Sequence, residues 1–264
     1  MSSEHLHPNL VLERHGAIEI VRVDREEVLG ALNFNIQAAL GDYVTDLAQR
    51  KDEVRVLILT GTGRGFVAGA DIADYHGASQ TVFDDFQRRS RMTFDSIANL
   101  PQATICAVNG YALGGGFELA MCCDFIFVNN KTKLGLPEIK LGLLPGGGGT
   151  QRLPRLVGPM RAKDLLMTGR MISGQEAVEY GVALEACAPD KLIPRVMEFA
   201  QELAKQAPVA LREAKRVVDD GLDTAMTAGL TMEQRVLGAL YATEDGKEGI
   251  AAFMEKRDPD FKGR

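Results

Sequence analysis

Short apolar runs separated by glycine-rich turns fill the first half of the chain. The segment Ala17–Val23 alternates apolar with polar residues, which predicts a half-buried strand. Apolar residues then recur at helical spacing between Ile36 and Leu47, and residues 82–98 also predict a helix. Further strands are expected at three apolar runs, Val54–Thr60, Ala103–Val108 and Phe125–Val128.

The pattern changes near residue 159, beyond which helical spacing dominates. Strands that come first and helices that come last predict an α/β fold. We expect two parts, a core over residues 1–200 and a C-terminal helical region over residues 201–264, although no flexible linker marks the boundary. Helices are expected at Met160–Met167, Gly174–Tyr180, Leu192–Lys205, Val209–Asp220, Ala225–Leu240 and Glu244–Lys256.

The stretch Pro101–Gly149 contains two glycine-rich turns, each beside a glutamate. Gly114-Gly115-Gly116 precedes a short apolar segment that carries Glu118, so these glycines are expected at a helix N-terminus. Free backbone N–H groups there favour negative charge, and glycine lets a ligand approach the backbone closely. The second turn, Gly142–Gly149, follows Glu138. We expect Glu118 and Glu138 to face one substrate.

Composition narrows the class of partner. The chain has 264 residues, with 30 Lys and Arg against 36 Asp and Glu, a net charge of −6. That balance argues against broad nucleic-acid binding and favours a small-molecule partner. The uncharged stretch from Ser96 to Phe117 is interrupted by Pro101 and several polar residues, so it predicts buried core and not a membrane segment.

Cysteine usage and the N-terminus bear on location. The four cysteines have neither metal-ligand spacing nor the density of a disulfide framework, which favours a reducing compartment. The first sixteen residues do not resemble an export or transit segment, so a cytoplasmic protein is expected.

The glycine-rich loop Gly61–Ile72 is not a nucleotide motif. A dinucleotide fingerprint starting at Gly61 would need glycine where Phe66 stands, and the chain has no Gly-Lys-Ser/Thr sequence for a P-loop. Neither nucleotide cofactor is indicated, and the loop by itself is typical of a surface turn.

Three segments together resemble the enoyl-CoA hydratase/isomerase family, also called the crotonase family. They are Phe66–Ile72, Asn109–Leu119 and Pro137–Arg152, and the ending Ala252–Arg257 is similar to the family's C-terminal signature. The resemblance implies a spiral of ββα units followed by a helical trimerisation region. It also implies a homotrimer or a dimer of trimers, that is, a hexamer.

The resemblance implies an oxyanion hole in which the backbone N–H groups of Ala70 and Gly115 stabilise the enolate of an acyl-CoA thioester. Glu118 would activate water as a general base for attack at Cβ, and Glu138 would supply the proton at Cα. The backbone of Gly146 would help to position the water. The implied reaction converts a trans-2-enoyl-CoA into a 3-hydroxyacyl-CoA and requires no metal or redox cofactor.

Coenzyme A binding is also implied by the resemblance. Phe253 and Lys256 would contact the coenzyme across a trimer interface, and Arg64 would contact a phosphate. Two positions depart from the family: Ala73 and Gly30 stand where basic residues are common. The remaining binding candidates belong to one loop, in which Asp71 has a supporting role: Ala68, Asp71 and Ile72.

Two alternatives stay open from the sequence. An isomerase of the same family would shuttle a proton with Glu138 alone, and a non-catalytic oligomeric binding protein would use neither glutamate in chemistry. Each glutamate also has a structural interpretation, because a carboxylate in the first turn of a helix is favourable by itself. The acyl pocket is expected between Tyr75 and Met92 and in parts of the C-terminal helices. Fatty-acid degradation by β-oxidation is one of several pathways that present such substrates.

Overall fold

The strands form two β-sheets, and the computed structural model describes residues 2–264. The smaller sheet has the order β10-β9-β7-β5, with bounds Met171–Ser173, Lys133–Gly135, Tyr111–Leu113 and Gly65–Val67. The larger sheet has the order β1-β2-β3-β4-β6-β8-β11, with bounds Ser2–His7, Leu10–His15, Ile18–Val23, Val56–Gly61, Ala103–Val108, Phe125–Asn129 and Glu185–Cys187.

The chain alternates between the sheets as it advances. Each of the strands β4, β6 and β8 in the larger sheet is followed by β5, β7 or β9 in the smaller sheet, and then by helix. Strands β3, β4, β6, β8 and β11 pair in parallel, whereas β1, β2 and β3 pair in antiparallel. The expected spiral of ββα units is therefore confirmed, with an antiparallel extension at its N-terminal edge.

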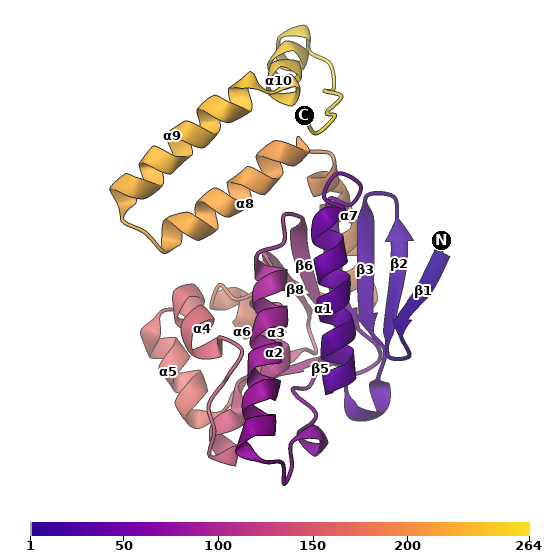
Figure 1. Ribbon diagram of the computed structural model, residues 1–264, viewed down its shortest axis with the longest axis vertical. Coiled ribbons are helices and arrows are strands. Elements are labelled where there is room, and N and C mark those ends of the chain that lie inside the picture. The colour runs from indigo at the N-terminus through magenta and orange to yellow at the C-terminus, as the bar shows by residue number, and fades with distance from the viewer. Residues whose placement is uncertain (1) are drawn as a thin grey trace.

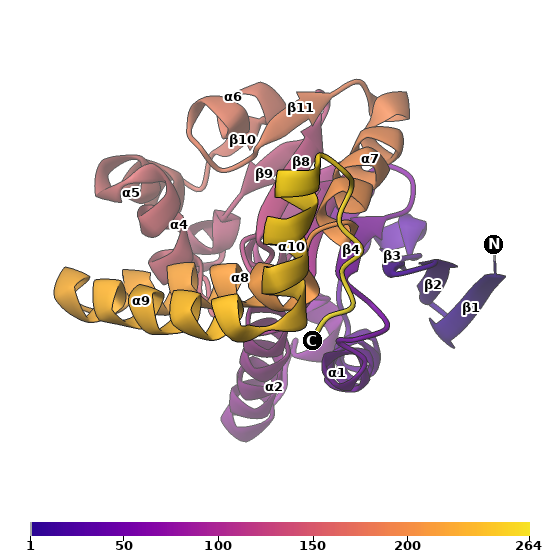
Figure 2. The ribbon, with the colours of Figure 1, turned by 90° about the horizontal axis from the view of Figure 1, so that it is seen from above.

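Helices cover both faces of the larger sheet (Figures 1 and 2). Apolar residues of α1 (Phe34–Gln49) and α2 (Gln80–Ala98) join one buried cluster with the sheet. Those of α7 (Leu192–Ala204) join a second cluster on the opposite face. The shorter helices are α3 (Gly115–Ala120), α4 (Gly149–Val157), α5 (Pro159–Thr168) and α6 (Gly174–Glu179). The 3-10 turns are η1 (Glu26–Val28), η2 (Ile72–Asp74), η3 (Pro137–Leu141) and η4 (Pro189–Lys191).

The last three helices project from the body (Figure 1). They are α8 (Pro208–Leu222), α9 (Met226–Ala242) and α10 (Glu244–Glu255). Helix α8 is anchored by Lys215, whose Nζ lies 3.0 Å from Asp124 Oδ2. Helix α9 has no buried residue within the described chain. The chain end folds back on α10, where the Asp245 carboxylate accepts from the backbone N–H groups of Lys262 and Gly263.

The longer predicted helices and strands are confirmed, with bounds that agree to within a few residues. The strand Ala103–Val108 begins and ends at the predicted residues. The stretch Ser96–Phe117 becomes the end of α2, two strands and the start of α3. Within the described residues, none of the helices combines the length and apolarity that crossing a membrane requires. The division at residue 200 stays a prediction, and it falls inside α7.

Candidate active site

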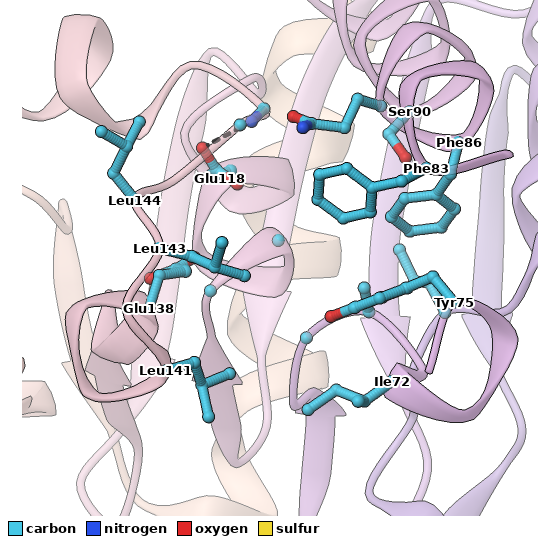
Figure 3. Close-up of a pocket in the computed structure, with 18 of the residues that line it drawn as sticks. Ile72, Tyr75, Phe83, Phe86, Ser90, Glu118, Glu138, Leu141, Leu143 and Leu144 are labelled. Atoms are coloured by element: carbon cyan, nitrogen blue, oxygen red, sulfur yellow. Dashed lines mark hydrogen bonds between the residues drawn. The ribbon is translucent and has the colours of Figure 1, made fainter. Parts of the chain in front are cut away.

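A cavity of about 230 Å³ opens beside the smaller sheet, where the loops after β5 and β7 meet α2 and η3. Two walls face each other across it in Figure 3. One wall is aromatic and the other holds both predicted glutamates among leucines, so a mostly apolar space has two carboxyl groups on one side. The aromatic wall has Tyr75, Phe83 and Phe86, and the facing wall has Glu118, Glu138, Leu141, Leu143 and Leu144.

Glu118 is held in place by backbone amides. It lies in the first turn of α3 and is 3% exposed. Its Oε1 accepts from the N–H of Gly147 at 2.8 Å and from the N–H of Gly149 at 2.7 Å. Burial raises the pKa of the Glu118 carboxyl, while these amides and the positive charge of Arg152 oppose the rise. The second glycine-rich turn thus stabilises the charged form of a buried carboxylate.

The carboxyl group of Glu138 has fewer hydrogen-bond donors around it than that of Glu118. It lies in the first turn of η3, and its buried Oε2 has no hydrogen-bond partner in the part of the chain that the structure describes. Burial, with a smaller contribution from the charge of Glu118, raises the pKa of Glu138 to about 7, although its own backbone N–H opposes the rise. Burial therefore raises the pKa of both neighbouring carboxyl groups, but only Glu118 accepts hydrogen bonds from the amides of the second glycine-rich turn, which favour its charged form.

Two free backbone amides lie close to the glutamates. Among residues 2–264, the N–H groups of Ala70 and Gly115 donate to no backbone acceptor. A Cβ built on Gly115 would lie only 3.9 Å from the Ala70 nitrogen, so both amides face the same space. Gly114 supports this turn with a positive φ of 51°, a conformation that glycine adopts without strain. The geometry provides a pair of donors for one developing negative charge.

The Ala70 loop is fixed by a contact that sequence reasoning missed. Arg25 Nη1 donates to Asp71 Oδ2 at 2.7 Å and to the Ala31 carbonyl at 3.0 Å. Next to it, Leu32 N–H donates to Gly69 O, and Asp71 N–H donates to Leu32 O. Asp71 lies outside the cavity lining, and its contacts with Arg25 and Leu32 hold the loop in place.

Other predicted residues divide into two groups. Ala68, Ile72 and Gly146 line the cavity. Arg64, Phe253 and Lys256 do not, and all three are exposed. Phe253 and Lys256 lie on the projecting α10 and at its C-terminal cap, and Phe253 is 82% exposed.

The two departures from the family pattern differ in their surroundings. Gly30 has a φ of 76°, and a Cβ there would overlap the carbonyl oxygen of Phe66. A basic side chain therefore does not fit at Gly30 in this backbone. Ala73 is exposed in η2, and nothing in the structure explains the missing charge there.

The cavity includes polar residues that no sequence motif marked. Gln37, Gln87 and Ser90 line it together with Tyr75 and Phe94. Four of the five fall in the region 75–94, near the expected acyl pocket, but their helical spacing is that of ordinary core packing. No cluster of three or more His, Cys, Asp or Glu residues suited to a metal occurs in residues 2–264. Within one chain, the C-terminal helices contribute nothing to this cavity.

Comparison with known proteins gives consistent matches. The family described as Enoyl-CoA hydratase/isomerase matches residues 13–264. The chain is 39% identical to a crotonyl-CoA hydratase of Syntrophomonas wolfei over 96% of this chain and 97% of that protein. It is 37% identical to a short-chain-enoyl-CoA hydratase of Clostridium acetobutylicum, over 97% and 98%. An enoyl-CoA hydratase structure from Bacillus anthracis superposes with a TM-score of 0.94 and 37% identity, covering 97% of this chain and 100% of that one.

Proposed function

The chain belongs to the enoyl-CoA hydratase/isomerase family, and from this premise we propose that it adds water to a trans-2-enoyl-CoA to give a 3-hydroxyacyl-CoA. One observation carries the proposal: the carboxyl groups of Glu118 and Glu138, which differ in hydrogen bonding, line one mostly apolar cavity together with the free backbone amides of Ala70 and Gly115. Addition of water needs one group that takes a proton and another that gives one. Relatives named as crotonyl-CoA and short-chain-enoyl-CoA hydratases support the same reaction.

The proposed steps start at the thioester carbonyl. Its oxygen accepts from the N–H groups of Ala70 and Gly115, which stabilise the enolate as charge develops. The water oxygen bonds to Cβ while Glu118 takes one water proton, and the electron pair of the double bond moves toward the thioester oxygen. The enolate then takes the proton of Glu138 at Cα and the carbonyl re-forms. Transfer of the captured proton from Glu118 back to Glu138 restores the starting state.

The surroundings of the glutamates support this division of roles. The amides on Oε1 favour the charged form of Glu118, whereas burial raises the pKa of Glu138 to about 7. The pair therefore holds one proton near neutral pH, because removal of the second proton would place two charges in one buried space. Glu118 is the base and Glu138 the acid. The backbone of Gly146, exposed at the cavity wall, is the proposed contact for the attacking water.

Loss of the conjugated enoyl-thioester absorbance of crotonyl-CoA tests the proposal. We expect rapid loss with the native protein and a fall in kcat of about 10²- to 10⁴-fold in both Glu118→Gln and Glu138→Gln. An isomerase that uses Glu138 alone is the second candidate. If the protein is such an isomerase, the Glu118→Gln variant would still catalyse migration of the double bond in a 3-enoyl-CoA. Absence of hydration by the native protein, with crotonyl-CoA and with longer enoyl-CoA, would contradict the hydratase function.

We propose that the projecting helices bind further copies of the chain. Exposed apolar side chains gather on them, and an apolar surface of this kind is typical of a protein interface. A trimer or a dimer of trimers would bring Phe253 and Lys256 of one copy toward coenzyme A in a neighbour. The exposed side chains are Val218, Leu222, Met226, Leu230, Leu237, Tyr241, Ile250, Phe253 and Met254.

Light scattering after size exclusion measures the assembly directly. We expect the mass of a trimer or hexamer, and a smaller species for Leu230→Glu with Leu237→Glu, because both side chains are half-exposed on α9. A native protein that elutes as a monomer at micromolar concentration would contradict the proposed assembly.

Lys256→Ala is expected to raise KM for the CoA substrate and to leave kcat nearly unchanged, and Arg64→Ala is the matched test of the other phosphate candidate.

The proposed reaction needs no metal or redox cofactor, since the two carboxyl groups and the amides supply the proton transfer and the charge stabilisation. Activity is expected to survive dialysis against a chelator.

We also propose a cytoplasmic location, which the four free cysteines Cys106, Cys122, Cys123 and Cys187 support. Cell fractionation with a tagged chain tests the location.

A further inference from the structure

Three uncharged polar side chains form a strip on the helical wall of the cavity, among aromatic residues. The polar strip consists of Gln37 from α1 and Gln87 and Ser90 from α2. Gln87 and Ser90 are three residues apart and therefore lie on the same face of α2. Ser90 Oγ donates to Gln37 Oε1 at 2.6 Å, which joins the two helices at this point.

The side-chain amide of Gln37 has a nitrogen, Nε2, that is available to donate a hydrogen bond. It is 4% exposed, yet it lines the cavity. The Ser90 hydroxyl occupies its Oε1, but no acceptor within residues 2–264 is hydrogen-bonded to its Nε2. This nitrogen is not one of the fully buried unpartnered side-chain atoms of the described chain, so it is open to the cavity. A ligand that displaces solvent from the cavity must offer an acceptor atom to this amide, because an amide left buried without a partner is destabilising.

Gln87 adds a second donor. Its Oε1 lies against the backbone of Gly146, and a Cβ added to that glycine would overlap this oxygen. The Gln87 side chain therefore reaches from α2 to the loop after η3 and closes the cavity on that side. Its carboxamide makes no hydrogen bond in the described part of the chain, which leaves Nε2 free to donate.

The charges around the cavity select the kind of acceptor. Among the lining residues that the structure describes, the charged types are two glutamates, Glu118 and Glu138, with no Lys, Arg or His. A carboxylate on the ligand would meet like charge with no cation to offset it in an apolar space, which is unfavourable. A hydroxyl or carbonyl oxygen accepts hydrogen bonds without that penalty.

We propose that the polar strip recognises a neutral oxygen atom, either a hydroxyl or a carbonyl, on the acyl chain of the substrate beyond its double bond. The inference rests on the proposed hydratase function, because the amides of Ala70 and Gly115 would direct the acyl chain into this cavity. The preferred substrates are then oxygen-bearing 2-enoyl-CoA thioesters, and Gln37 is the residue that distinguishes them from plain hydrocarbon chains.

Matched substrates test the proposal. The pairs are 5-hydroxypent-2-enoyl-CoA with hex-2-enoyl-CoA, and 6-hydroxyhex-2-enoyl-CoA with hept-2-enoyl-CoA, because the members of each pair have the same number of chain atoms. In the native protein we expect the hydroxylated member of at least one pair to have the higher kcat/KM. Gln37→Met is expected to lower kcat/KM for that member by about 3- to 10-fold and to change the hydrocarbon partner by less than about twofold.

Thr93→Val is the matched control. Thr93 is a buried polar residue of α2 that faces Gly41 of α1 and lies outside the cavity lining, so its replacement tests helix packing alone. It is expected to leave the ratio between paired substrates unchanged. An equal effect of Gln37→Met on both members of both pairs would show that Gln37 serves packing only and would overturn the proposal.

A substrate with a terminal carboxylate tests whether the polar strip prefers a neutral oxygen to a charged one. Hex-2-enedioyl-CoA is expected to react at least about 10-fold less efficiently than 6-hydroxyhex-2-enoyl-CoA, because no cation in the lining offsets its terminal charge. A preference for hex-2-enedioyl-CoA would overturn the assignment of a neutral ligand. Crotonyl-CoA, which is too short to carry the group, reports on the hydratase function itself: its hydration with no change in the paired ratios would reject this inference alone.

Discussion

The two turns that carry the glutamates are built differently. At α3, the backbone of Gly147 and Gly149 donates two hydrogen bonds to one oxygen of Glu118. At η3, Glu138 is half-buried, and its buried Oε2 has no partner within residues 2–264. The two carboxyl groups therefore differ in both burial and hydrogen bonding. The comparison indicates that backbone amides, supplied by a glycine-rich loop distant in sequence, favour the charged form of Glu118.

The largest effect is expected at the α3 side, from Gly147→Ala. A Cβ at this position would lie 2.6 Å from Cε2 of Phe94 and 2.9 Å from Glu118 Oε2. The loop must shift, and its amide then leaves Glu118. We expect kcat for crotonyl-CoA hydration to fall by about 100-fold or more, since loss of a preorganised group typically costs that much. Steady-state kinetics measure the change, and a melting temperature close to that of the native protein would show that the chain still folds.

The pH dependence of activity sharpens the comparison. Glu138 must be protonated to supply the Cα proton, and its pKa is about 7. The kcat/KM for hydration is expected to fall about tenfold per pH unit above this pKa, and to fall on the acid side as Glu118 becomes protonated. Residual activity of Glu138→Gln should lack the alkaline limb. A native profile that is flat from about pH 6 to pH 9 would argue against these roles.

Thermal stability should respond to a different extent at the two glutamates. A raised pKa in the folded protein means that stability is greatest when the carboxyl is protonated and declines as pH rises through the folded pKa. At about pH 8, Glu138→Gln removes a buried charge and is expected to raise Tm by a few degrees. The pKa of Glu118 is also raised, but Glu118→Gln weakens the charge-assisted hydrogen bonds from Gly147 and Gly149, so its gain in Tm is expected to be smaller than that of Glu138→Gln. Calorimetry of both variants measures the difference, and a gain in Glu118→Gln as large as that in Glu138→Gln would contradict it.

The smallest effect is expected from Gly142→Ala, at the end of η3. A Cβ there meets nothing within 4 Å, but φ is 73°, so the cost is backbone strain alone. We expect a loss of about 1 kcal/mol in the free energy of unfolding and a kcat within about threefold of the native value. A fall in kcat as large as that of Gly147→Ala would mean that the backbone conformation at η3 matters as much for activity as the loop that contacts Glu118.

Much of the fold could be predicted because its elements have strong local patterns. The apolar run Ala103–Val108 and the amphipathic residues 82–98 become a strand and a helix that pack as expected. The N-terminal strands β1 and β2 were missed, since Ser2–His7 is polar and its pairing depends on a neighbouring strand. The three-residue strands of the smaller sheet are too short to show a period.

The residues of the candidate site also include some that local sequence patterns predicted and some that they missed. Glu118, Glu138, Ala70 and Gly115 were predicted through motifs, and the structure brings all four together. The Arg25 contact with Asp71 joins residues 46 positions apart, so no local pattern indicates it. The polar strip was missed for a related reason: a glutamine on a helix facing another helix looks like any core position until the cavity beside it is known.

The central claim is that the two glutamates hold opposite protonation states, and infrared spectroscopy of the unliganded protein tests it most directly. At about pH 6, we expect the carbonyl stretch of a buried, protonated carboxylic acid that disappears in Glu138→Gln and persists in Glu118→Gln. The band should fade in the native protein as pH rises through about 7. A band that disappears in Glu118→Gln and persists in Glu138→Gln would contradict the account.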